Sequence, residues 1–134
     1  MWHSISLVGR VVRDPDTRYT PAGTCVSNIT VAVDYYFKEE RRTIWIRVTT
    51  WEKLAEFVME KITKGALVVV EGHLSPGDDG SPRIWTDKDG NSRASYEVTA
   101  KTLRVLVWKG SSESDRTEGP KAEETPKGDV VAPF

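Results

Sequence analysis

The sequence predicts an all-β fold, a five-stranded Greek-key barrel with one helix between the third and fourth strands. Three observations support this prediction. Most segments between residues 3 and 108 alternate apolar and polar side chains, as strands do. Only one segment has the period of a helix, and clusters of Pro, Gly, Asp and Ser separate the segments. The 134 residues, 38% of them hydrophobic, suit a single domain followed by a tail.

Composition excludes several kinds of site and protein. The single cysteine, Cys25, rules out an intramolecular disulfide and a multi-cysteine metal centre. His3 and His73 are the only histidines, so a histidine-rich site is excluded, and we expect no metal and no cofactor. No segment approaches the ~18 apolar residues of a membrane span, and MWHSISLVGR does not resemble a secretory signal. We therefore expect a cytoplasmic protein with no membrane partner.

The charge is close to balanced, with 19 basic and 20 acidic residues and a formal net charge of −1. Residues 109–134 contain four basic and six acidic residues, which leaves 15 basic and 14 acidic residues in 1–108. An anion-binding surface must therefore arise from the local arrangement of charges, because net charge does not indicate one.

The first half of the chain predicts two strands joined by a turn. Residues 3–12 alternate, with a bulge or bend expected at Gly9. The segment RDPDTRYTPAGT at 13–24 has the composition of a turn. The second strand, 26–37, alternates clearly, with one face formed by Ile29, Val31 and Val33 and the other by Thr30, Ala32 and Asp34.

A charged hairpin tip, KEERR at 38–42, leads to a third strand at 43–50. Just before this tip stand Tyr35 and Tyr36, and alternation requires one of the two to point inward.

The helical segment is WEKLAEFVMEKITKG, at 51–65. Its apolar residues recur at helical spacing and form one face, Leu54, Phe57, Val58 and Ile62. Thr49 with Glu52 resembles a capping box, and Gly65 stands where a glycine would end the helix.

Two further strands and an arm complete the domain. Residues 66–74 are apolar at both parities, which favours a strand covered on both sides. After a turn at 75–82, residues 83–95 contain Asp89-Gly90 and predict a hairpin arm. The last strand, 96–108, changes parity near Lys101, where we expect a bulge.

The element order is that of an OB-fold, over a domain we place at residues 1–108. Residues 109–134 are rich in Pro, Gly, Ser, Glu and Lys and cannot bury enough apolar area to offset their ordering entropy. We expect a disordered tail.

The third strand, TIWIRVTTW, carries the strongest functional signal. Alternation assigns one face to the core, with Ile44, Ile46 and Val48. The other face then presents Trp45, Arg47, Thr49 and Trp51. Exposed indoles can stack on any nucleobase, and a guanidinium between them can hold a phosphate. The alternative is that both tryptophans are buried under a loop or in a subunit contact.

Two more aromatic residues stand among basic ones at the ends of elements. Phe37 ends the second strand beside Lys38, Arg41 and Arg42, and Trp85 lies in the arm near Arg83 and Arg93. Aromatic residues interleaved with cations are the pattern that single-stranded nucleic acid requires. Nothing in the sequence indicates an enzyme, since no nucleophile has a partnering base.

The chain resembles the bacterial-type single-stranded DNA-binding protein family over nearly all of residues 3–108. The segments that carry the resemblance are SLVGRVVRDPDTRYTPAGTCVSNITVAV, TIWIRVTTWEKLAEFV, KGALVVVEGHL and RIWTDKDG. The resemblance implies binding and protection of single-stranded DNA in replication, recombination and repair, in the cytoplasm at the nucleoid. It assigns DNA stacking to Phe37, Trp45, Trp51 and Trp85, and backbone contacts to Arg47, Lys53, Lys64, Arg83 and Arg93.

The resemblance also implies a homotetramer and a tail whose tip recruits replication and repair proteins. The tip here is GDVVAPF, in which Pro133 and Phe134 match but the family's acidic run is reduced to Asp129. Ile46 stands where many relatives have histidine, and SPGDDGSP is an insertion before the arm.

Two other functions stay open at this point. An OB-fold module for RNA would use the same stacking chemistry, because stacking alone does not distinguish the sugars. An adaptor protein would use the tryptophan face for protein contacts.

Overall fold

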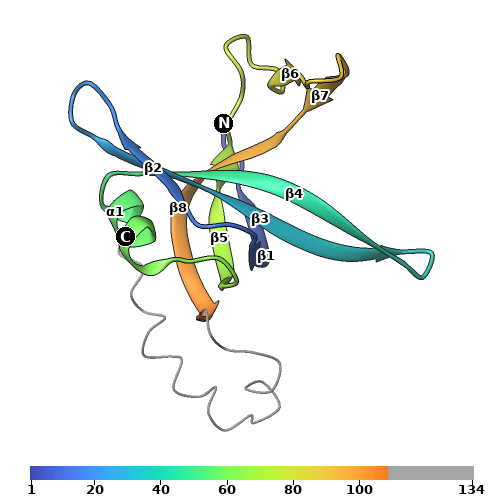
Figure 1. Ribbon diagram of the computed structural model, residues 1–134, viewed down its shortest axis with the longest axis horizontal. Helices are drawn as coiled ribbons and strands as arrows, with labels where there is room; N and C mark the ends of the chain where they lie inside the picture. The colour runs from blue at the N-terminus through green and yellow to red at the C-terminus, as the bar shows by residue number, and fades with distance from the viewer. Residues whose placement is uncertain (109–134) are drawn as a thin grey trace, which may run out of the picture.

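The structure, a computed structural model, describes residues 1–108. Most of this part of the chain is in strands, with a single α-helix between β4 and β5 (Figure 1). In chain order the elements are β1 Ile5–Val11, β2 Asp16–Tyr19, β3 Cys25–Phe37, β4 Glu40–Trp51, α1 Glu52–Lys61, β5 Leu67–Leu74, β6 Ile84–Thr86, β7 Ser92–Ala94 and β8 Tyr96–Val107.

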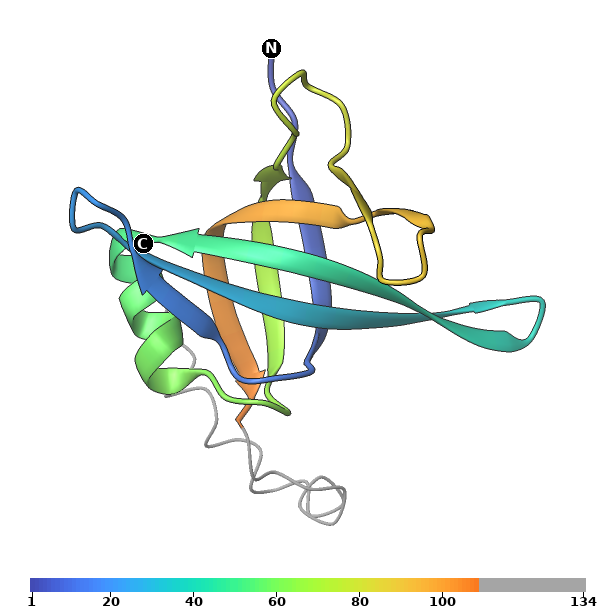
Figure 2. The same ribbon diagram turned by 45° about the horizontal axis from the view of Figure 1, so that its top comes forward.

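Five long strands close into a barrel, which confirms the predicted OB-fold (Figure 2). The strand order is β1-β5-β8-β4-β3-β2, and closure comes from a second pairing of β1, with β3. The helix α1 lies at one end of the barrel and contributes its predicted apolar face to the core. Within residues 1–108, no helix is both long enough and apolar enough to cross a membrane.

Gly9 allows the barrel to close. Strand β1 pairs with β5 through Ile5–Arg10 and then with β3 at Arg10 and Val11, so β3 passes close to the middle of β1. A Cβ atom at Gly9 would lie 2.5 Å from the carbonyl oxygen of Ala32. The expected irregularity at Gly9 is therefore a close approach of two backbones, with the β1–β5 register unbroken.

The bulge expected near Lys101 is present. Glu71 is opposite Thr102 and Gly72 is opposite Ala100, so Lys101 is the extra residue. The expectation that 66–74 is covered on both sides is wrong, because only one face of β5 is buried. Val68 and Val70 are fully buried, whereas Val69 is half-buried on the outside of the barrel.

The segment 13–24 is not only a turn, because it contains the short strand β2, which pairs with the first residues of β3. The hairpin tip is shorter than predicted. Lys38 and Glu39 both have positive φ, and the strands run up to them on both sides. Tyr35 and Tyr36 are both exposed, because this part of the hairpin projects beyond the barrel and has no core to face (Figure 2).

The predicted capping box does not form. Strand β4 continues to Trp51, so Thr49 still lies opposite Asn28 and donates its hydroxyl hydrogen to the Asn28 side-chain oxygen at 2.8 Å. Trp51 is the N-cap and makes no side-chain capping bond. The helix ends at Lys61, before Gly65, whose N–H donates to the carbonyl oxygen of Val11.

Candidate nucleic-acid interface

Paired residues of β3 and β4 form successive rows of side chains across the outer face of the barrel, and each row contains one residue from each strand. Trp51 lies opposite Val26, which is in turn paired with Arg18 of β2. Two rows further along, Arg47 lies between Thr30 of β3 and Glu97 of β8. These rows follow from strand pairing alone, because partners opposite each other point to the same face.

The two tryptophans of β4 are open to solvent. Trp45 is 58% exposed and Trp51 is 46% exposed, whereas Val48 and Thr50, on the other face of the strand, are fully buried. The alternative in which a loop buries both indoles is therefore wrong. At about 3.3 Å per residue, the six residues that separate the two rings place them about 20 Å apart along the strand.

Arg47 lies between the two indoles with a free side chain. Its guanidinium makes no hydrogen bond or ion pair with any other side chain in residues 1–108. A free guanidinium between two open aromatic faces can contact a phosphate, or it can stack as a cation on a base.

Three shallow grooves run along this face. One of about 280 Å³ adjoins Trp51, one of about 410 Å³ adjoins Trp45, and one of about 130 Å³ lies by Arg47. Together they are lined by seven basic residues, Arg10, Arg13, Arg18, Arg41, Arg47, Lys64 and Arg83, and by four acidic ones, Asp14, Asp16, Asp34 and Glu97. The excess of three positive charges makes this face locally cationic.

Sequence reasoning missed three of these cations as interface residues, Arg10, Arg13 and Arg18, whereas it named Arg41 only as a cation beside Phe37. Arg18 comes to the groove through the pairing of β2 with β3, which the turn-like composition of 13–24 concealed. The alternation of β1 was the available signal for Arg10, because its neighbour Val11 is a core residue.

Phe37 lies at the tip of the projecting β3–β4 hairpin (Figure 2). By alternation it belongs to the face of Val33, opposite to that of Trp45. The Lys38 ammonium nitrogen is 5.4 Å from the ring centroid, and the guanidinium carbon of Arg42 is 5.1 Å from it. The ring therefore already has cations beside it.

An ion pair stiffens this hairpin. Arg41 donates to the carboxylate of Asp34, and the hydroxyl of Thr43 donates to the same carboxylate at 2.7 Å. The Thr43 hydrogen bond, followed by that from Arg41, lowers the pKa of Asp34.

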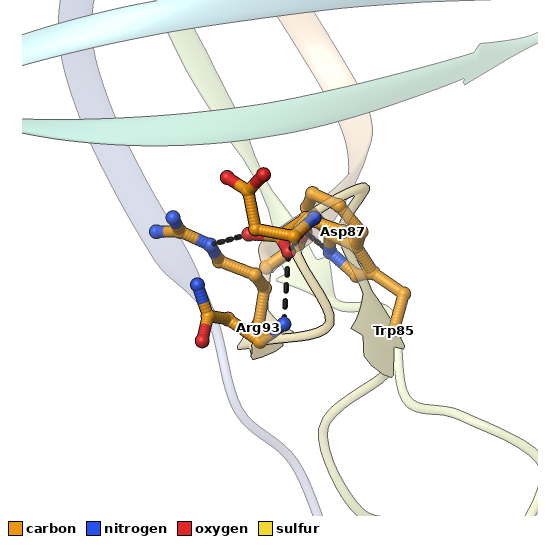
Figure 3. A network of polar contacts seen from close by, with 6 residues as sticks. Trp85, Asp87 and Arg93 are labelled. Atoms are coloured by element: carbon orange, nitrogen blue, oxygen red, sulfur yellow. Dashed lines mark hydrogen bonds and ion pairs between the residues drawn. The ribbon is translucent and has the colours of Figure 1, made fainter.

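Trp85 lies in the β6–β7 arm (Figure 3). It is 47% exposed, and its indole N–H donates to the hydroxyl oxygen of Ser95 at 2.9 Å. Arg93 is its cross-strand partner, as the sequence predicts. The hydrogen bond holds the indole against the arm and leaves part of the ring open.

Asp87 organises the end of the arm. One carboxylate oxygen accepts the backbone N–H groups of Asp89 and Asn91, both at 2.9 Å, and the other accepts Nε–H of Arg93 at 2.8 Å (Figure 3). These bonds, that from Arg93 first, lower the pKa of Asp87 below its ordinary 3.8.

The remaining basic residues predicted for the site are dispersed. Lys64 lines the groove beside Trp45, and Arg83 lines the groove beside Trp51. Lys53 is exposed on the first turn of α1 and lines none of the three grooves. The tip residues Asp129, Pro133 and Phe134 lie outside the described residues.

Residues 2–106 match the single-strand binding protein family. A single-stranded DNA-binding protein of Thermotoga maritima is 37% identical over 122 residues, covering 87% of this chain and 82% of that protein. Single-stranded DNA-binding protein 1 of Xylella fastidiosa is 36% identical over 110 residues, covering 78% of this chain and 76% of that protein. A single-stranded DNA-binding protein of Neisseria meningitidis is 33% identical over 109 residues, covering 78% of this chain and 59% of that protein.

The Asp87→Asn variant should loosen the arm in a pH-dependent way. Because the folded-state pKa is lowered, the carboxylate stabilises the arm above pH 3.8 and loses this effect as the pH falls through the folded-state value. At neutral pH we expect about two- to five-fold lower hydrogen-exchange protection at the amides of Asp89 and Asn91, a difference that disappears in acid. The control is Asp89→Asn, since the Asp89 carboxylate makes no bond within residues 1–108. Equal protection in Asp87→Asn and the unaltered chain at neutral pH would contradict the assignment.

Proposed function

The chain belongs to the single-strand binding protein family, and from this membership we propose how it binds single-stranded DNA. Unpaired bases stack on Trp45, Trp51, Trp85 and Phe37, while Arg47 and neighbouring cations hold the backbone. Binding is non-catalytic and independent of base sequence, and it coats and protects single strands in replication, recombination and repair. The relatives are named as binding proteins, which agrees with the prediction that the chain is not an enzyme.

The observation that carries this proposal is the face of β4, where two exposed indoles flank a guanidinium that has no side-chain partner within residues 1–108. Stacking contributes about 1–3 kcal/mol per base and does not depend on which base it is, because every base has an aromatic face. Four stacking sites therefore supply about 4–12 kcal/mol before ordering costs. This gain accounts for strong binding by a chain with a net charge of −1.

Cations contribute mainly to the rate of encounter and to the path of the backbone. Screening at physiological salt has a length of about 8 Å, so only the charges that touch a phosphate act at full strength. The grooves provide such charges on both sides of Arg47, with Lys64 and Arg10 near Trp45 and Arg83 and Arg18 near Trp51. A strand that crosses this face meets a base platform and a cation at each step.

The Trp45→Ala and Trp85→Ala variants should each weaken binding of oligo-dT by about 1–3 kcal/mol, because each removes one stacking platform. Fluorescence anisotropy of a labelled oligo-dT measures the affinity. Trp2→Ala is the matched control, since Trp2 is 86% exposed but precedes β1 and is not one of the four proposed stacking residues.

In the same titration, duplex DNA of equal length should not compete, and oligo-rU reports any preference for RNA. Unchanged affinity in both tryptophan variants would remove the basis for stacking on these rings. Strong binding of protein partners to this face, with no binding of oligo-dT, would favour the adaptor function instead.

We further propose that the chain acts as a homotetramer around which DNA wraps. One chain offers a short binding surface for a long DNA strand, and several copies side by side would extend that surface. Apolar side chains outside the grooves support a subunit contact, since Val8, Leu74 and Leu106 are exposed on β1, β5 and β8.

The expected solution mass of the tetramer is four times the 15.0 kDa of one chain. Light scattering with and without a single strand of ~35 nucleotides measures it. A monomer mass in both conditions would contradict the tetramer.

The segment 109–134 is proposed to be a cytoplasmic partner-recruiting tail that takes no part in holding DNA. It contains six acidic and four basic residues, so it repels a polyanion slightly. Deleting it should leave the oligo-dT affinity unchanged or raise it by up to about two-fold. A tenfold loss of affinity would show that the tail contacts DNA.

Peptides that end in GDVVAPF, with and without Asp129, test whether the tip binds replication and repair proteins.

A further inference from the structure

The groove beside Trp51 contains one carboxylate among three guanidinium groups. Of the described residues that line it, Glu97 is the only acidic one, and Arg18, Arg47 and Arg83 are basic. Its side chain is only 10% exposed, although it lies in a groove open to solvent. A nearly buried carboxylate in a surface for a polyanion opposes binding unless it has another task.

Glu97 is bonded to the base of the arm. The Nε of Arg83 is 3.3 Å from Oε2 of Glu97, and Arg83 is the residue immediately before β6. Beside this pair, the backbone N–H of Ser75 donates to the carbonyl oxygen of Glu97 at 2.9 Å. The two chain segments that lead into and out of the insertion before the arm are therefore both tied to β8 at Glu97.

The geometry of Arg83 leaves part of its charge available. Nε is the nitrogen that lies 3.3 Å from Oε2 of Glu97, and the Arg83 side chain as a whole is 56% exposed. A guanidinium has five N–H donors in a planar fork, so the terminal nitrogens can still bind a phosphate. We therefore expect Glu97 to orient the Arg83 guanidinium while its terminal N–H groups stay available to a phosphate.

Arg83 is also linked to Trp85 through Ser95. Trp85 is two residues beyond Arg83, its indole donates to the Ser95 hydroxyl, and the N–H of Ser95 donates to the carbonyl oxygen of Arg83 at 3.4 Å. A change in the position of Arg83 is transmitted to the indole through these contacts and the short intervening chain. Outside the β6–β7 hairpin itself, the Arg83–Glu97 ion pair is the only one between the arm and the barrel in residues 1–108.

We propose that Glu97 is a positioning residue for DNA binding, which rests on the proposed function of this face. Glu97 anchors Arg83, which lines the groove, and so sets the position of the arm that carries Trp85 and leaves the terminal nitrogens of Arg83 available for a phosphate. The repulsion between the carboxylate and DNA is smaller than the gain from an arm that is already in place, because a free arm would lose its mobility on binding.

The test compares Glu97→Gln and Glu97→Asp with the unaltered full chain, by anisotropy of labelled oligo-dT. Gln removes the charge and Asp keeps it but shortens the reach to Arg83. If Glu97 positions the arm, both variants should bind about three- to ten-fold more weakly. In the Trp85→Ala background both variants should have a smaller effect, because the indole is absent and only the Arg83 guanidinium is left to position. Glu71→Gln is the matched control, since Glu71 is exposed on β5 outside the grooves.

A spectroscopic readout separates positioning from general destabilisation. In protein labelled with 5-fluorotryptophan, the ¹⁹F resonance of Trp85, assigned through Trp85→Phe, should shift or broaden in Glu97→Gln without DNA. The resonance of Trp45 should stay in place, because Trp45 lies on the barrel in another groove.

Tighter binding by Glu97→Gln, to the same extent with and without Trp85, would overturn the proposal and identify Glu97 as a repulsive charge only. An unmoved Trp85 resonance would overturn it independently of DNA. Failure of the unaltered chain to bind oligo-dT would overturn the proposed function itself, and this inference with it.

Discussion

The antiparallel pairing of β3 with β4 is the constraint on which the interface depends. It runs without a break from Val26 opposite Trp51 to Phe37 opposite Glu40. A slip of one residue would turn Val48 to solvent and both β4 tryptophans into the core, so the buried face determines the exposed one. The energy that selects the register comes from burying aliphatic side chains, and the open aromatic face is its geometric consequence. The core and the proposed binding surface are therefore formed by the two opposite faces of β4.

Local arrangement of charge explains how a chain with a net charge of −1 presents a cationic face. Seven basic and four acidic residues line the three grooves, and they come from segments far apart in the sequence, with Arg10 on β1, Arg18 on β2 and Arg83 before β6. Strand pairing gathers them on one side of the barrel. At a screening length of about 8 Å, the rest of the surface has little influence on a phosphate bound there. Net charge is thus a poor guide to this kind of interface.

Much of the fold could be predicted from local patterns, because a strand with one buried face alternates over its whole length. The face of Trp45 and Trp51 and the bulge at Lys101 both followed from parity. Features that depend on a distant partner could not be predicted. Strand β2 exists only because β3 offers it an edge, and Thr49 bonds Asn28 across the sheet rather than capping the helix. For the same reason the role of Glu97 depends on a pairing with Arg83 that no short motif reveals.

Two of the four aromatic residues are held by the barrel, and the other two are held on hairpins that project from it. Trp45 and Trp51 are held by the barrel, whose apolar packing is not screened by salt. Phe37 and Trp85 are on projecting hairpins in which ion pairs add to the strand pairing, Asp34–Arg41 on one and Asp87–Arg93 on the other. Salt screens the contacts between cations and phosphates, and it also weakens the pairs that keep these two rings in place. Under the proposed function, we therefore expect binding at high salt to depend mostly on the two tryptophans of β4, where stacking does not depend on charge.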